Sequence, residues 1–244
     1  MRKNTKIMSI LTIVIGISLF GITGGTYSYE GDTGERGERV YFMFGGSKID
    51  LKTLNARLES QGYPTFSDNF FSLGGGGYKI INWVVIGGEG HGFLGRETLT
   101  TSGNYKVSLS GGYGFLNVGY LVYSLENLSV YPLLGFGRGR MRFKLVERGL
   151  PSFNEVLEDP KRSAELLTGG FLVNVALGAD GLLKLRENEK GKGGFAIGLC
   201  VGYLFTPVKG DWVVEGMDIS DGPLVGITGP YVRVMLGGGK MGKI

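Results

Sequence analysis

Two side chains that could share a proton, Glu89 and His91, lie two residues apart in a glycine-rich stretch. Side chains of a β-strand alternate between its two faces, so residues two apart share one face. An imidazole beside a carboxylate is the base and orienting group that acyl transfer uses. The nearest candidate nucleophiles are Ser108 and Ser110, on the next predicted strand. The spacing therefore admits acyl-transfer chemistry, but no residue pattern singles out either serine.

A series of basic residues occupies the even positions at 138–144, while Met141 and Phe143 occupy odd positions. We expect the basic series to face a barrel interior, where charged groups must be paired or pay the cost of desolvation. Because acidic partners are too few, the outer end of the series could hold an anionic group such as a lipid phosphate. The predicted interior polar network consists of Glu89, His91, Arg138, Arg140, Arg142, Lys144, Asp180 and Lys184. Its simplest interpretation is structural filling of a narrow lumen.

Other chemistries find no support in the sequence. One Cys and one His cannot build a metal site of the usual ligand spacing, and Cys200 has no partner for an internal disulfide. The glycine-rich segments 87–92 and 135–139 lack the Lys-Ser/Thr pair of a phosphate-binding loop and do not open a helix. We therefore predict no cofactor, no metal and no catalytic residue.

These residues must be positioned by strands, because period-2 apolar patterning dominates the chain. We predict an all-β fold, an up-and-down antiparallel β-barrel of about eight strands. The predicted strands are 39–46, 71–81, 83–94, 104–123, 128–145, 168–186, 193–206 and 224–238. No later segment is long and apolar enough to predict a membrane helix.

The face pattern of 193–206 predicts which side of the sheet meets lipid. Its odd positions run from Phe195 to Phe205 and are bulky and apolar, whereas its even positions are mostly Gly, Ala and Cys. A face of such small residues is unusual for a water-exposed sheet but suits the crowded interior of a narrow barrel. Aromatic residues near the predicted strand ends also resemble the interfacial girdles of membrane barrels.

Loop lengths alternate along the chain. Short turns are predicted near 82–83, 126–127 and 187–192, and long loops at 46–71, 95–103, 146–168 and 207–223. Outer-membrane barrels place short turns on the periplasmic rim and long loops outside. One short helix is predicted at about 50–61 in the first long loop, and a weaker one at 152–166.

The N-terminal segment 1–28 is predicted to be a cleaved signal peptide, with a basic start, an apolar stretch and small residues before the cleavage site. A polar linker at 29–38 and a barrel domain at 39–240 follow. The predicted leader holds three of the 26 basic residues and none of the 22 acidic ones, so the remaining chain is nearly neutral. This charge gives no support for nucleic-acid binding.

With its leader, even strand number, alternating loops and aromatic strand ends, the chain resembles small eight-stranded outer-membrane β-barrel proteins over about residues 39–240. The resemblance implies a monomer in the cell outer membrane, in contact with membrane lipid and possessing a side-chain-filled lumen. It implies a structural or surface-interaction role and assigns no specific activity.

Two alternatives remain open from the sequence. The chain does not end in the aromatic residue usual for such barrels, which favours a secreted or periplasmic soluble barrel that binds an apolar ligand. In that case Cys200 would face outward. The other alternative is a lipid-modifying barrel enzyme, a hydrolase or acyltransferase, that uses Glu89 and His91.

Overall fold

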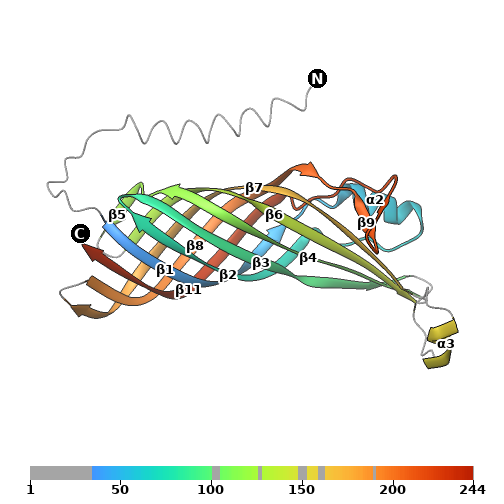
Figure 1. Ribbon diagram of the computed structural model, residues 1–244, viewed down its shortest axis with the longest axis horizontal. Helices are drawn as coiled ribbons and strands as arrows, with labels where there is room; N and C mark the ends of the chain where they lie inside the picture. Colours follow the sequence, from blue (N-terminus) through green and yellow to red (C-terminus); the bar gives the residue numbers. More distant parts are fainter. Residues whose placement is uncertain are drawn as a thin grey trace, which may run out of the picture. The chain divides into compact units, whose positions relative to one another are not determined.

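Eight long antiparallel strands form the wall of the molecule, as the patterning predicts (Figure 1). The computed structural model describes residues 35–100, 105–125, 128–147, 153–158, 163–188 and 191–243. The wall strands are β1 (Glu35–Lys48), β2 (Asn69–Ile81), β3 (Val84–Leu99), β4 (Tyr105–Tyr120), β6 (Leu128–Glu147), β7 (Ser163–Asn188), β8 (Gly191–Lys209) and β11 (Gly229–Lys243). The shorter elements are α2 (Lys52–Ser60), β5 (Tyr123–Leu125), α3 (Phe153–Glu158), β9 (Trp212–Val214) and β10 (Met217–Ile219).

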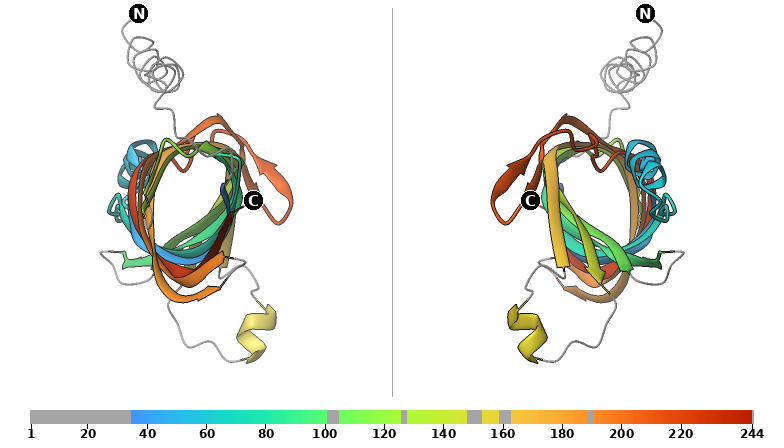
Figure 2. Two further views of the ribbon diagram at one scale, coloured as in Figure 1. Left: turned by 90° about the vertical axis from the view of Figure 1, so that its left-hand side faces the viewer. Right: turned by 90° about the vertical axis from the view of Figure 1, so that its right-hand side faces the viewer.

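The wall strands close into a ring, which Figure 2 shows end-on. Each strand pairs with its sequence neighbours in the wall, and β1 pairs with β11 over 13 residue pairs from Glu35↔Lys243 to Ser47↔Tyr231. This closure removes the unpaired edges that an open sheet would expose. The predicted all-β, up-and-down barrel is therefore confirmed.

The two rims differ in the sense that the loop lengths predict, although β3 extends to Leu99 and takes up more than half of the loop predicted at 95–103. Asn82 and Trp83 have φ of 48° and 75° and make the two-residue turn between β2 and β3. The start of β1 and the end of β11 lie at the same rim as this turn. Helix α2 and the β9–β10 hairpin lie at the opposite rim, which we call the long-loop rim (Figure 1). None of the helices in the described part of the chain is long and apolar enough to cross a bilayer.

Element boundaries differ from the predictions at a few places. Strand β1 begins at Glu35, so residues 35–38 of the predicted linker belong to the barrel wall. Segments 1–28 and 29–34 lie outside the described residues. Helix α3 covers six residues, and β7 begins at Ser163, within the helix predicted at 152–166. The hairpin β9–β10 was predicted as loop, since three-residue strands are too short to show a period.

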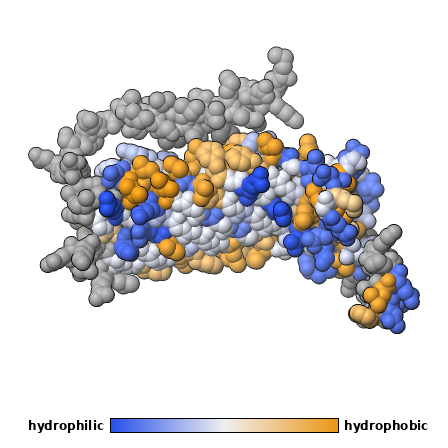
Figure 3. Space-filling model, viewed as in Figure 1, coloured by the Kyte–Doolittle hydropathy of each residue, from blue (hydrophilic) through white to orange (hydrophobic). Residues whose placement is uncertain are grey.

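The two faces of the wall have opposite character. On β8, Ile197, Leu199 and Val201 are exposed outward, while Ala196 and Cys200 are buried inside. Figure 3 shows hydrophilic residues gathered toward both ends of the molecule, with mainly neutral and hydrophobic residues on the wall between them. The bulky face is therefore outside and the small face inside, as the pattern of 193–206 predicts.

Apolar side chains fill the barrel toward the long-loop rim. Leu54 and Leu58 of α2 are buried, and Phe66 meets the inward Phe143 edge-on at 6.2 Å between ring centroids. The amide of Asn55 exchanges two hydrogen bonds of 2.9 Å with the backbone of Phe66, which holds α2 against the returning chain. Apolar side chains from the first long loop thus pack against β6 at this rim.

Candidate functional site

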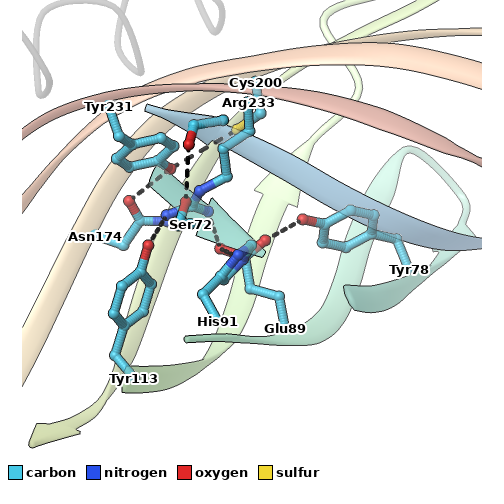
Figure 4. Close-up of polar contacts among 10 residues, drawn as sticks. Ser72, Tyr78, Glu89, His91, Tyr113, Asn174, Cys200, Tyr231 and Arg233 are labelled. Carbon is cyan, nitrogen blue, oxygen red and sulfur yellow. Dashed lines mark hydrogen bonds and ion pairs between the residues drawn. The ribbon is translucent and has the colours of Figure 1, made fainter. Parts of the chain in front are cut away.

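A buried arginine, Arg233 of β11, is the centre of the polar cluster inside the barrel (Figure 4). Its Nη1 lies 2.8 Å from Glu89 Oε1, and its Nη2 donates a hydrogen bond of 2.7 Å to the hydroxyl of Tyr113. The guanidinium also lies 3.6 Å from the ring centroid of Tyr231. The side chain is fully buried, so these contacts replace its hydration.

Glu89 receives several contacts from neighbouring strands. The hydroxyl of Tyr78 donates to its Oε2 at 2.8 Å. His91 Nε2 lies 3.8 Å from its Oε1, too far for a hydrogen bond, and the imidazole stacks on Tyr113 at 5.2 Å. Glu89 and His91 are 7% and 5% exposed, so a substrate cannot reach either one through the described wall.

The cluster continues across the lumen to the opposite strands. Tyr231 donates a hydrogen bond of 2.9 Å to Asn174 Oδ1, and Cys200 Sγ lies 3.7 Å from the Tyr231 hydroxyl. Side chains from β2, β3, β4, β7, β8 and β11 thus meet in one network (Figure 4). Such a network ties strands that the backbone ladder does not join directly.

Inward glycines make room for these side chains. A Cβ at Gly202 would lie 2.6 Å from the hydroxyl of Tyr231, and one at Gly76 would lie 2.8 Å from Cβ of Glu89. Real Cβ atoms do not approach so closely, so only glycine at these two positions leaves room for Tyr231 and Glu89 on the adjacent strands. The high glycine content of the chain is thereby partly explained by its crowded lumen.

A second buried ion pair lies closer to the short-turn rim. Arg39 Nε is 3.3 Å from Asp180 Oδ1, and Arg39 Nη1 also donates to the carbonyl oxygen of Lys240 at 3.0 Å. The two side chains are almost fully buried. The lumen thus holds two separate Arg–carboxylate pairs, each linking strands distant in sequence.

The acids of both pairs were predicted from the sequence, but the arginines were not. Glu89, His91 and Asp180 lie inside, where they were placed by face parity. Arg233 and Arg39 were not identified. Arg233 lies between Val232 and Val234 in an apolar alternation, a signal that could have been used, whereas Arg39 directly follows the charged segment 35–38. Strand β7 includes Lys184, but its side chain lies outside the described residues.

The inward face predicted for the basic series of β6 is wrong. Arg138, Arg140, Arg142 and Lys144 are exposed on the outer face, which they share with Leu134 and Phe136. The intervening residues Met141 and Phe143 face inward and are buried. The 20-residue β6 is longer than the roughly 9–11 residues that span a bilayer, so its outer face can change from apolar to basic without turning inward.

The serines proposed as nucleophiles also face away from the predicted base. Ser108 and Ser110 lie on the outer face of β4, whereas the neighbouring Leu109 is fully buried inside. Glu89 and His91 point into the lumen on the other side of the wall. The arrangement needed for acyl transfer is therefore not formed by these residues.

No group of three or more Cys, His, Asp or Glu residues in the described ranges is placed to bind a metal ion.

A groove lies on the outer wall beside the first two arginines of the β6 series, and we call it the two-arginine groove. Its volume is about 770 Å³. Arg138 and Arg140 line it together with outward glycines of β4 and β7, and Asp211 contributes the acidic side chain among the lining residues. Of the sites described, this groove is the one open to the surroundings of the barrel.

Solved structures of other proteins match most of this chain at low sequence identity. The attachment invasion locus protein Ail of Yersinia pestis is 13% identical, covers 85% of this chain and 98% of its own, and has a TM-score of 0.41. Neisserial surface protein A is 12% identical, with 88% and 100% covered and a TM-score of 0.35. The outer membrane protease OmpT of Escherichia coli is 9% identical, with 90% and 99% covered and a TM-score of 0.31. No protein-family model and no curated protein matches the sequence.

Proposed function

We propose that this protein is an integral outer-membrane β-barrel with a closed lumen that serves a structural or surface-interaction role. The observation that carries the proposal is the apolar belt on the outer wall. Leu116, Val40 and Phe42 are 75%, 69% and 54% exposed, and similar side chains follow on every wall strand. A soluble monomer rarely exposes so large a contiguous apolar surface, whereas a membrane barrel requires one.

The placement of Cys200 supports this proposal over a soluble barrel that binds an apolar ligand. Such a barrel would turn its bulky faces inward and Cys200 outward. In the structure Cys200 is buried beside Tyr231, while Leu199 and Val201 on either side face outward. Among the described residues, the inward side chains around Cys200 include the polar groups of Tyr231, Asn174 and Arg233, which an apolar ligand would not match.

The proposal extends to the ends and assembly of the chain. Residues 1–28 would direct export and be cleaved, and the barrel would act as a monomer whose long-loop rim faces outside. Lipid would contact the belt, and other molecules would meet the long-loop rim. Exposed Phe153 and Leu157, one turn apart on α3, supply apolar side chains suited to such contact.

The test is membrane fractionation of the full-length protein followed by gel electrophoresis with and without heating. We expect recovery with the outer membrane, resistance to carbonate extraction and a heat-dependent shift in gel mobility, because a closed hydrogen-bonded barrel resists denaturant until heated. Recovery as a soluble protein without detergent would contradict the proposal.

A further inference from the structure

We infer that the two-arginine groove binds the phosphate of an anionic lipid, with the lipid chain lying along the outer wall. This inference rests on the proposed membrane location. The shared chemistry is recognition of a phosphate by two guanidinium groups, which offer planar, paired donors matched to phosphate oxygens.

The arginines begin where the apolar belt ends on β6. Leu134 and Phe136 face outward and are exposed, and Arg138 and Arg140 occupy the next two outward positions. At about 3.3 Å per residue, the two arginines are roughly 6.6 Å apart along the strand. They therefore lie at the depth where lipid phosphates meet the acyl chains on the long-loop side.

No described carboxylate is paired with either of these two arginines. Arg142, the next basic residue on the same face, pairs with Glu165 at 3.1 Å. Within the described residues, neither Arg138 nor Arg140 forms an ion pair. Asp211 lines the groove as well, so its carboxylate opposes an anion. Two positive charges against one negative charge leave the groove suited to an anionic ligand.

The strand register places glycines, which have no side chains, next to the two arginines. Arg138 pairs with Gly114 on one side and Phe171 on the other, and Arg140 pairs with Gly112 and Gly169. Because glycines have no side chains, the surface beside each arginine is lowered and leaves the groove open. Gly114 pairs in turn with Gly90 of β3, which continues this low strip around the barrel.

The apolar neighbours favour a lipid over a free phosphate. Phe136 and Phe171 stack at 6.3 Å between ring centroids, and both are exposed on the outer wall. Phe171 lies directly across from Arg138. A ligand with a phosphate at one end and a hydrocarbon chain at the other satisfies both surfaces together, whereas inorganic phosphate would use only the arginines.

The experiment measures lipid binding to the folded full-length protein in a non-ionic detergent by native mass spectrometry. The probes are dioleoyl phosphatidic acid, dioleoyl phosphatidylcholine and inorganic phosphate. We expect phosphatidic acid to bind about tenfold more tightly than phosphatidylcholine, and the double variant Arg138→Gln/Arg140→Gln to lose about tenfold in affinity for phosphatidic acid. An excess of inorganic phosphate should leave the lipid bound.

Two matched variants control for general charge. Arg142→Gln removes a basic residue that already has a partner, and Lys79→Gln removes an exposed basic residue at the opposite rim, where Lys79 pairs with Glu38 at 3.7 Å. Both should keep the wild-type affinity within about twofold. An equal loss in Arg142→Gln, an unchanged affinity in the double variant, or displacement of the lipid by inorganic phosphate would each overturn the inference.

A gain-of-binding variant keeps the inference testable if the double variant does not fold. Asp211→Asn removes the carboxylate that lines the groove and should raise the affinity for phosphatidic acid about two- to threefold. No increase in this variant would count against the inference. Heat-dependent gel mobility reports folding for each variant, and failure of membrane fractionation would reject the proposed location separately.

Discussion

At the scale of single residues, Arg233 is the charged group on which the main buried polar cluster is centred. It bonds to Glu89 and Tyr113 and lies over Tyr231, so one side chain of β11 links to β3 and β4 across the lumen. Removing one partner of a buried ion pair leaves an uncompensated charge, whereas replacing both with apolar groups can be nearly neutral. The pair should therefore show strong coupling between its two members.

A double-variant cycle tests this coupling. Glu89→Leu and Arg233→Met should each lower the free energy of unfolding by about 3–5 kcal/mol, and the double variant should lose less than the sum. Urea unfolding in lipid vesicles, followed by Trp83 and Trp212 fluorescence, measures the effect. Lys79→Met, which breaks an exposed pair, should cost less than about 1 kcal/mol. Additive losses would show that the pair is not coupled.

The acids of the lumen could be predicted from sequence, but their partners could not. Alternation with small or apolar neighbours placed Glu89 and Asp180 on the inward face. Which arginine reaches them depends on the distance across a closed ring, and neither Arg233 nor Arg39 is near its partner in sequence. The alternation of inward and outward positions along one strand gives no information on that distance.

At the scale of elements, strand length explains the wrong face predicted for the basic series. The prediction placed the basic residues of 128–145 inside the barrel and Met141 and Phe143 on the other face. Strand β6 continues to Glu147, and its outward positions change from Phe136 to Arg138 at the edge of the belt. The even positions shared by Leu134 and Arg138 would have given the correct face had membrane thickness been included.

The hairpin β9–β10 provides a prediction about local stability. Trp212 is buried, and its indole N–H donates to the Pro223 carbonyl oxygen at 2.7 Å. Trp212→Ala should remove this anchor and make residues 210–228 sensitive to limited proteolysis, while heat-dependent gel mobility persists. Met217→Ala, at the exposed tip, should leave the proteolysis pattern unchanged. Loss of the heat-stable form in Trp212→Ala would show that the hairpin is needed by the whole barrel.

At the scale of the whole molecule, the described residues inside the wall include two buried ion pairs, Arg39–Asp180 and Arg233–Glu89. Apolar residues of segment 224–228, Val225 and Ile227, are buried as well. We expect no stable ionic conductance in planar lipid bilayers, since eight-stranded barrels leave little room beyond their own side chains. Regular single-channel steps, beyond those of a mock purification, would contradict a closed lumen.

Labelling of the single cysteine, Cys200, tests which face of β8 lies inside the barrel. Cys200 should not react with a maleimide in the folded protein and should react after heating, because the wall shields its thiol. In Met217→Cys the hairpin tip should react before and after heating, which shows that the reagent works. Rapid labelling of wild-type Cys200 in the folded state would mean that the faces of β8 are reversed.

The seam between β1 and β11 has a consequence for the kinetics of assembly. The other wall pairings join sequence neighbours, whereas this one joins residues as distant as Glu35 and Lys243. Contacts so remote must wait for the chain ends to meet, so hairpins can zip up first while two strand edges stay open. A Cβ at Gly237 would collide with the Val40 carbonyl oxygen on the opposite side of the seam. Gly237→Ala should therefore slow ring closure in a refolding time course and prolong the period in which the open edges can aggregate.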